Sequence, residues 1–144
     1  MIITVDTNVM YQALHSSNGA SFQILQLLRK GNFKLAISHA VLCEYEDVLS
    51  RPKSLVEFGL KRSDIAKFLR YIAYISEKHD PRFLFRPNLK DENDNMFVEL
   101  AIVSQSRYLI TSNIKDFISG ELTFNNFKLL TPTDFLILWR KYYE

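Results

Sequence analysis

Acidic side chains lie at positions in the chain that suit metal-dependent chemistry. Asp6 follows the apolar run of residues 2–5, Glu44 and Glu46 follow a second apolar run, and Asp94 lies in the cluster DENDN. Asp116 follows shortly after Thr111, Ser112 and Asn113. Carboxylates that gather at one point repel one another, so such a cluster is most readily explained by a hard divalent cation that neutralises it. Oxygen ligands without clustered cysteine or histidine favour Mg²⁺ or Mn²⁺ over Zn²⁺.

The elements that must position these acids alternate between two kinds. Short apolar runs at residues 2–5, 34–38, 108–111 and 127–131 predict strands. Helical spacing of apolar residues follows in the segments 22–28, 41–49, 65–75, 97–101 and 135–139. This alternation predicts an α/β fold with a mainly parallel sheet covered by helices on both faces. Ligands bind beyond the carboxyl ends of such strands, so the acids are expected to converge on one sheet edge.

Boundary residues give more local expectations. Ser38 is expected to cap the helix that contains Glu44, and Pro52 is expected to end it after Arg51. Pro132 is expected to open the last helix at its first turn. Ser63 and Asp64 are expected to begin the long helix, and residues 79–95 are expected to form a loop with at most one short strand.

Composition excludes several classes of protein. The 144 residues are 47% hydrophobic and 24% charged, which predicts one globular domain spanning residues 1–144. Cys43 is the single cysteine, so internal disulfides are excluded, and we expect it to be a small buried hydrophobe in a cytoplasmic protein. No apolar run approaches the ~18 residues of a membrane span, so no membrane association is expected. No glycine-rich phosphate loop or hydrolase triad motif is present.

Each candidate residue also has a purely structural interpretation. Asp6 is equally explained as a cap of the turn after its strand, and Asp94 as a carboxylate that complements a helix dipole. Asn8 and Asn113 suit turns, and Thr111 suits a strand end. Helical periodicity does not choose between Glu44 and Glu46, which flank the same apolar stripe. The combination of residues, rather than any one of them, favours a metal site.

Positive charge is concentrated in one segment. Residues 51–90 carry ten lysines and arginines against four acidic residues, a net charge of +6, whereas the whole chain carries +2. Such a segment attracts phosphate backbones, although a solvated helix face carries the same excess for solubility alone.

Three stretches of the sequence together resemble the PIN-domain family of metal-dependent ribonucleases, whose bacterial members include the toxins of type II toxin–antitoxin modules. IITVDTNVMYQAL is similar to the first strand and its leading aspartate, here Asp6. SHAVLCEYEDVLSRP is similar to the second motif and selects Glu44 over Glu46. KDENDNMFVELAIVSQSRYLITSNIKDF is similar to the third and fourth motifs, which places the third acid on Asp94 and the strand-end threonine on Thr111.

This resemblance implies a three-layer α/β/α fold with a central, mainly parallel sheet of four to five strands. It implies an endoribonuclease in which Asp6, Glu44 and Asp94, with help from Asp116, hold one or two Mg²⁺ or Mn²⁺ ions at a scissile RNA phosphate. Thr7, Asn8, Asn95, Thr111 and Asn113 are then expected to orient carboxylates or waters. The RNA backbone is expected to contact Arg51, Lys53, Lys61 and Arg62. A cognate antitoxin and a homodimer or higher oligomer are the other expected partners.

The sequence departs from the family pattern at two positions. Many members carry an acid where this chain has Asn113, and some carry aspartate where it has Asn95. These departures leave open a catalytically silent module that binds RNA or a protein without cleaving RNA. An aspartyl phosphotransfer enzyme is a poorer alternative, because Asp6-Thr7-Asn8 lacks the second aspartate of a DxD motif.

Overall fold

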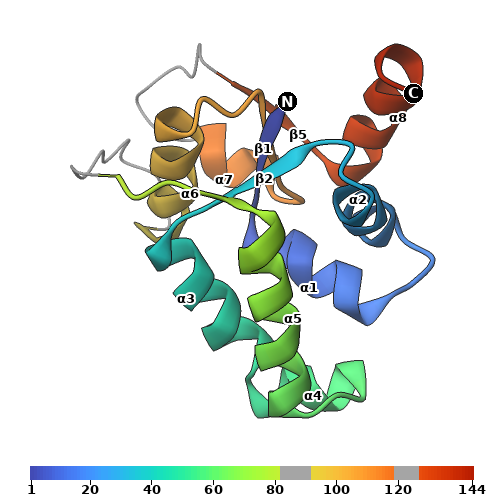
Figure 1. The fold of residues 1–144 in the computed structure, drawn as a ribbon, viewed down its shortest axis with the longest axis vertical. Helices are drawn as coiled ribbons and strands as arrows, with labels where there is room; N and C mark the ends of the chain where they lie inside the picture. Colours follow the sequence, from blue (N-terminus) through green and yellow to red (C-terminus); the bar gives the residue numbers. More distant parts are fainter. Residues whose placement is uncertain (82–91, 119–126) are drawn as a thin grey trace.

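The central feature is a five-stranded sheet in which neighbouring strands pair in parallel (Figure 1). This computed structural model describes residues 1–81, 92–118 and 127–144, with side chains at 92–94, 116 and 118 left out of the description. The strands are β1 (Ile2–Val5), β2 (Lys34–Ile37), β3 (Glu77–Lys78), β4 (Tyr108–Ile110) and β5 (Lys128–Leu130), in the order β3-β2-β1-β4-β5. The four expected strands are confirmed, and β3 is an addition.

Strand β1 occupies the centre of the sheet and is buried on both faces. Ile3 pairs with Leu35 of β2 and with Tyr108 of β4, and Val5 pairs with Ile110. Ile3 and Leu35 are completely buried. Burial on both faces explains why these strands are continuous apolar runs rather than alternating ones.

Helices form the two outer layers of the fold (Figure 1). They are α1 (Thr7–His15), α2 (Ala20–Arg29), α3 (His39–Leu49), α4 (Pro52–Phe58), α5 (Arg62–Ile75), α6 (Glu92–Val103), α7 (Ile114–Ile118) and α8 (Pro132–Tyr142). Helix α6 packs on β1, β2 and β4, whereas α2 and α8 pack together on the other side. Edge-to-face aromatic contacts of Phe33 with Phe135 and Trp139 fill that second layer.

Helix starts follow the local chemistry of the sequence. The Ser38 hydroxyl accepts a hydrogen bond from the Val41 amide (3.1 Å), which confirms it as the cap of α3. Thr131 caps α8, and Pro132 occupies its first position as expected. The long helix α5 begins at Arg62, with Asp64 accepting the Lys61 amide proton (2.9 Å).

Three local expectations are wrong. Residues 92–95 belong to α6 rather than to the loop expected over 79–95, and residues 82–91 of that stretch lie outside the described part of the chain. Helix α3 ends at Leu49, and Pro52 starts α4 rather than ending α3, because the first turn of a helix does not need the missing N–H. Cys43 is exposed rather than buried. The stripe of Val41, Tyr45 and Leu49 faces the core and leaves position 43 on the solvent side of α3.

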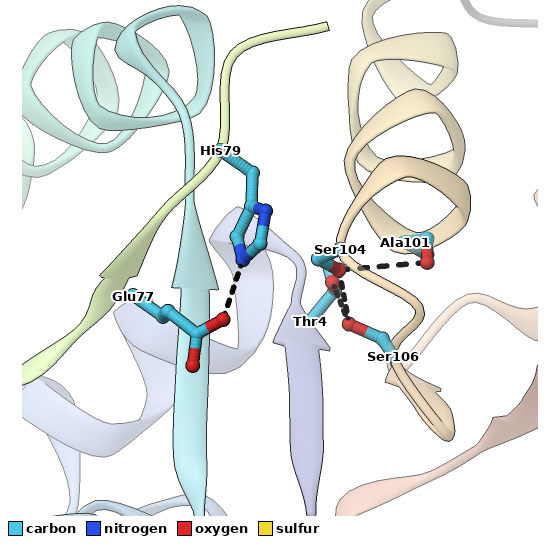
Figure 2. A network of polar contacts seen from close by, with 6 residues as sticks. All are labelled: Thr4, Glu77, His79, Ala101, Ser104 and Ser106. Atoms are coloured by element: carbon cyan, nitrogen blue, oxygen red, sulfur yellow. Dashed lines mark hydrogen bonds and ion pairs between the residues drawn. The ribbon is translucent and has the colours of Figure 1, made fainter.

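A chain of buried hydroxyl groups ties α6 to β1 (Figure 2). The Thr4 and Ser106 hydroxyl oxygens lie 2.9 Å apart, and those of Ser104 and Ser106 lie 2.7 Å apart. All three residues are buried, so these groups satisfy one another in place of water. At the sheet edge, the same view shows the His79 ring paired with Glu77 at 2.8 Å.

The turn after α6 contains a residue in an unfavourable backbone conformation. Gln105 has φ +56°, the left-handed region that glycine adopts most easily. We therefore expect Gln105→Gly to raise the free energy of unfolding by about 0.5–1 kcal/mol, measured by urea denaturation. Gln105→Ala is the matched control and should leave stability nearly unchanged. Equal effects from both variants would contradict the backbone explanation.

Candidate active site

Asp6 is a buried carboxylate at the carboxyl end of the central strand. Its side chain is 4% exposed, and its backbone amide donates to Ile110 of β4 (3.0 Å). Its Oδ1 accepts the Val9 amide proton (3.1 Å) and thereby caps α1. Its Oδ2 accepts a hydrogen bond from the Thr111 hydroxyl. The capping interpretation is therefore correct, and it coexists with a carboxylate held where ligands of parallel sheets bind.

Thr111 sets the orientation of that carboxylate from the neighbouring strand. It is fully buried directly after β4, and its backbone amide donates to Leu130 (2.9 Å). Its hydroxyl donates to Asp6 and accepts the Asn113 amide proton (3.0 Å). Because a hydroxyl has a single proton, giving it to Asp6 suits an ionised carboxylate. The structure thus joins three sequence-predicted residues at one edge.

Tyr45 is a contributor that sequence analysis did not single out. It is completely buried in α3, and its phenol donates to the Val5 carbonyl (2.5 Å). Burial raises the pKa of Tyr45 far above its usual value, and the negative charge of Asp6 raises it further. The phenol therefore stays protonated and remains a donor. Its signals in the sequence were its place in the apolar stripe of α3 and its position directly after Glu44 in the second family motif.

Glu44 and Glu46 have different surroundings. Glu44 is half-buried on α3, a helix that begins at the carboxyl end of β2 and packs against α1 and α6. Glu46 is exposed and lines a groove with Arg62 between α3 and α5. This difference favours Glu44 for the sheet edge, although its role in holding a metal stays a prediction.

The other two acids are placed by backbone only. Asp94 lies in the first turn of α6, and Asp116 lies in α7 after β4, but their side chains are outside the described residues. Among the side chains that the structure describes, no three His, Cys, Asp or Glu residues gather around one point. The complete ligand set at this edge therefore stays a prediction.

Two further buried oxygens fit a hard cation at this edge. Thr7 and Asn95 are 6% and 3% exposed, and the Thr7 hydroxyl and the Asn95 side-chain oxygen have no hydrogen-bond partner among the described residues. Buried polar atoms are normally satisfied by protein, water or an ion. An all-oxygen donor set of this kind fits Mg²⁺ or Mn²⁺.

The remaining predicted residues lie on the surface. Asn8 is exposed in α1. The four basic residues expected to contact RNA are all exposed and lie in or beside α4: Arg51, Lys53, Lys61 and Arg62. Arg51 pairs with Asp47 (2.9 Å), an exposed ion pair of small energetic weight. Helices α3, α4 and α5 extend past the sheet on the side where β1 runs into α1 (Figure 1).

A family model described as "PIN domain" matches residues 3–115. The chain belongs to the PIN-domain family. The match runs from β1 into α7 and includes Asp6, Glu44, Asp94 and Thr111, while Asp116 lies just beyond it. The family resemblance of the sequence motifs is therefore confirmed.

The chain is also similar to one known protein in sequence and to one solved structure in fold. Ribonuclease VapC2 of Rickettsia felis is 28% identical over 124 residues, which cover 81% of this chain and 90% of the relative. A chain in the crystal structure of VapBC2 from Rickettsia felis, bound to a DNA fragment from their promoter, superposes with a TM-score of 0.63. That match is 24% identical and covers 91% of this chain and 98% of the other, so it shows the three-layer fold. None of the helices described in this PIN domain is long and apolar enough to cross a membrane.

The Thr111 hydroxyl provides a test of how this PIN domain holds its buried carboxylate. Thr111→Val keeps the shape of the side chain but removes the donor to Asp6 and the acceptor for Asn113. We expect the free energy of unfolding to fall by about 1.5–3 kcal/mol in chemical denaturation, because the lost bond involves a charged group. Thr111→Ser keeps the hydroxyl and should lose only about 1 kcal/mol for the missing methyl. A valine variant as stable as the wild type would show that the bond does not support the edge.

Proposed function

We propose that this protein is a metal-dependent endoribonuclease that hydrolyses RNA phosphodiester bonds and acts as the toxin of a toxin–antitoxin pair. The observation that carries the proposal is the buried Asp6 carboxylate, held by Thr111 at the carboxyl end of the central strand in a PIN domain. Similarity to a protein named ribonuclease VapC2 supports this activity. Because one fold can carry many different activities, the proposal rests on this site rather than on the fold alone.

Four acids would hold Mg²⁺ or Mn²⁺ in this proposal: Asp6, Glu44, Asp94 and Asp116. When bound, the ion would polarise the RNA phosphate and lower the pKa of an attacking water. The acids themselves form no covalent bond to RNA. A hard cation is also what allows a phosphate to approach carboxylates that would otherwise repel it.

The remaining groups of the chain prepare this edge for the ion. Thr111 fixes the plane of the Asp6 carboxylate, and Tyr45 fixes the end of β1 from which Asp6 projects. The unpaired oxygens of Thr7 and Asn95 are suited to accept hydrogen bonds from water near the carboxylates. Asn8 and Asn113 would orient water or phosphate at the same edge. Groups held in place before the reaction lower the cost of reorganisation during it.

The two neighbouring glutamates give a matched test of this site. Glu44→Gln should reduce the rate of RNA cleavage by about a hundredfold or more, because it removes a charge that the cation requires. Glu46→Gln changes the same chemical group two residues away and should leave the rate unchanged. Asp94→Asn should abolish cleavage while circular dichroism shows an intact fold. The measurement is cleavage of a mixed cellular RNA pool by the purified protein.

Metal removal completes that experiment. Cleavage should stop with a chelator and return with Mg²⁺ or Mn²⁺. RNA binding without cleavage under any of these metals would instead favour the silent module. Full activity in folded Glu44→Gln and Asp94→Asn variants would reject the assigned residues.

The exposed cations around α4 are proposed to contact the RNA backbone. Arg51 and Lys53 lie at the start of α4, and Lys61 and Arg62 lie at the start of α5, so the four charges lie in or beside one short helix. Helices α3, α4 and α5 extend past the sheet on the side where β1 runs into α1 (Figure 1), and Asp6 is the residue between those two elements. Phosphate contacts of this type supply affinity and position but carry no sequence information.

The salt dependence of RNA binding measures these contacts. In the double variant Lys53→Gln and Arg62→Gln, the slope of log affinity against log salt should fall by about 1.4, because each contact to single-stranded RNA contributes about 0.7. The control is Lys34→Gln with Lys128→Gln, two exposed cations at the opposite, amino ends of β2 and β5. Equal slopes in the two double variants would place the RNA elsewhere.

We also propose the protein partners that this function requires. The solved relative is a VapBC2 complex, which supports a cognate antitoxin for this chain. A basic side chain of that partner would complement the carboxylates at the edge. We further propose a cytoplasmic homodimer or higher oligomer of a single PIN domain spanning residues 1–144.

A further inference from the structure

His39 and Cys43 form a pair of metal-ligating side chains that the proposed ribonuclease reaction does not use. They are one turn apart on α3, at positions i and i+4 that face the same side of a helix. Both side chains are exposed to solvent. The Cys43 sulfur and the His39 Nε2 lie 3.6 Å apart.

The spacing of these two atoms fits joint coordination of one ion. A tetrahedral zinc ion with a sulfur ligand at about 2.3 Å and a nitrogen ligand at about 2.0–2.1 Å keeps those ligands about 3.5 Å apart. The pair already has this separation, so no change of backbone is needed. Sulfur and imidazole nitrogen are the ligands that Zn²⁺ prefers, whereas Mg²⁺ and Mn²⁺ prefer oxygen.

The surroundings of the pair carry charges of both signs. Asp80 accepts the backbone amide proton of His39 (3.0 Å), which fixes the start of α3, and its other carboxylate oxygen lies 3.8 Å from the Lys78 ammonium. Cys43 and Glu46, one turn apart, line a groove of about 510 Å³ with Arg62 and with the ion pair of Asp47 and Arg51. Carboxylates near a cation site favour binding, and the two arginines oppose it.

We propose that His39 and Cys43 form a binding site for a thiophilic divalent cation of the Zn²⁺ class on the outer face of α3. The thiol releases its proton to solvent when the ion binds. The described side chains do not yet gather three ligands around one point, so Glu46 reaches the ion by a change of rotamer and water fills the remaining position. This site is chemically distinct from the oxygen-lined edge and does not rest on the proposed ribonuclease activity.

The experiment is a titration of the purified full chain with Co²⁺, a spectroscopic substitute for Zn²⁺. Thiolate ligation produces a sulfur-to-cobalt charge-transfer band, and Cys43 is the single cysteine of the chain. The band should saturate at one ion per chain and disappear on addition of Zn²⁺ but not Mg²⁺. Carboxylate sites do not produce this band, so the measurement separates the pair from the edge.

Variants then identify the ligands. His39→Ala should weaken Co²⁺ binding at least about tenfold, and Glu46→Gln should weaken it by a smaller factor. The control His15→Ala removes an exposed imidazole from α1 and should leave the dissociation constant unchanged. The proposal is overturned by the absence of the band in the wild type, or by an equal dissociation constant in a folded His39→Ala variant. An unchanged constant in Glu46→Gln overturns the part assigned to Glu46.

Discussion

A single buried carboxylate organises the edge at which this protein concentrates its polar groups. Asp6 terminates β1, caps α1 and accepts a hydrogen bond from the residue that terminates β4. A charge removed from water destabilises the folded state by several kcal/mol unless hydrogen bonds compensate it. The structure places an amide and a hydroxyl on that carboxylate, so the geometry of two strands and one helix is fixed by the need to satisfy it.

The elements of the fold could be predicted wherever a single segment of the sequence had a clear hydrophobic pattern. Apolar runs identified β1, β2, β4 and β5 because buried parallel strands leave continuous hydrophobic sequence. Strand β3 has two residues and helix α7 has five, and both are too short for a period to emerge. Pro52 was misassigned because the same residue ends one helix and begins another, and sequence spacing alone does not distinguish the two.

The sequence predicted which residues belong to the candidate site, but it did not predict the contacts between them. Strand ends pointed to Asp6 and Thr111, and family motifs pointed to Glu44 and Asp94. The contact between Asp6 and Thr111 joins residues 105 positions apart, so it depends on the strand order. Tyr45 looked like ordinary core because it lies in the apolar stripe of α3, and Cys43 was expected to be buried because free cysteine is among the most buried residue types.

The hydroxyl chain of Thr4, Ser104 and Ser106 has a mechanical consequence. It holds the carboxyl end of α6, while Asp94 stands about 15 Å away at the other end of the helix, given a rise of about 1.5 Å per residue. Rotation of α6 about that end would displace its other end the most. A tilt of about 5° at the serines would move the backbone of Asp94 by about 1.3 Å, a displacement large enough to cost about a hundredfold in an oriented reaction. Three small hydroxyls in the core therefore bear on where the backbone of Asp94 lies at the opposite end of α6.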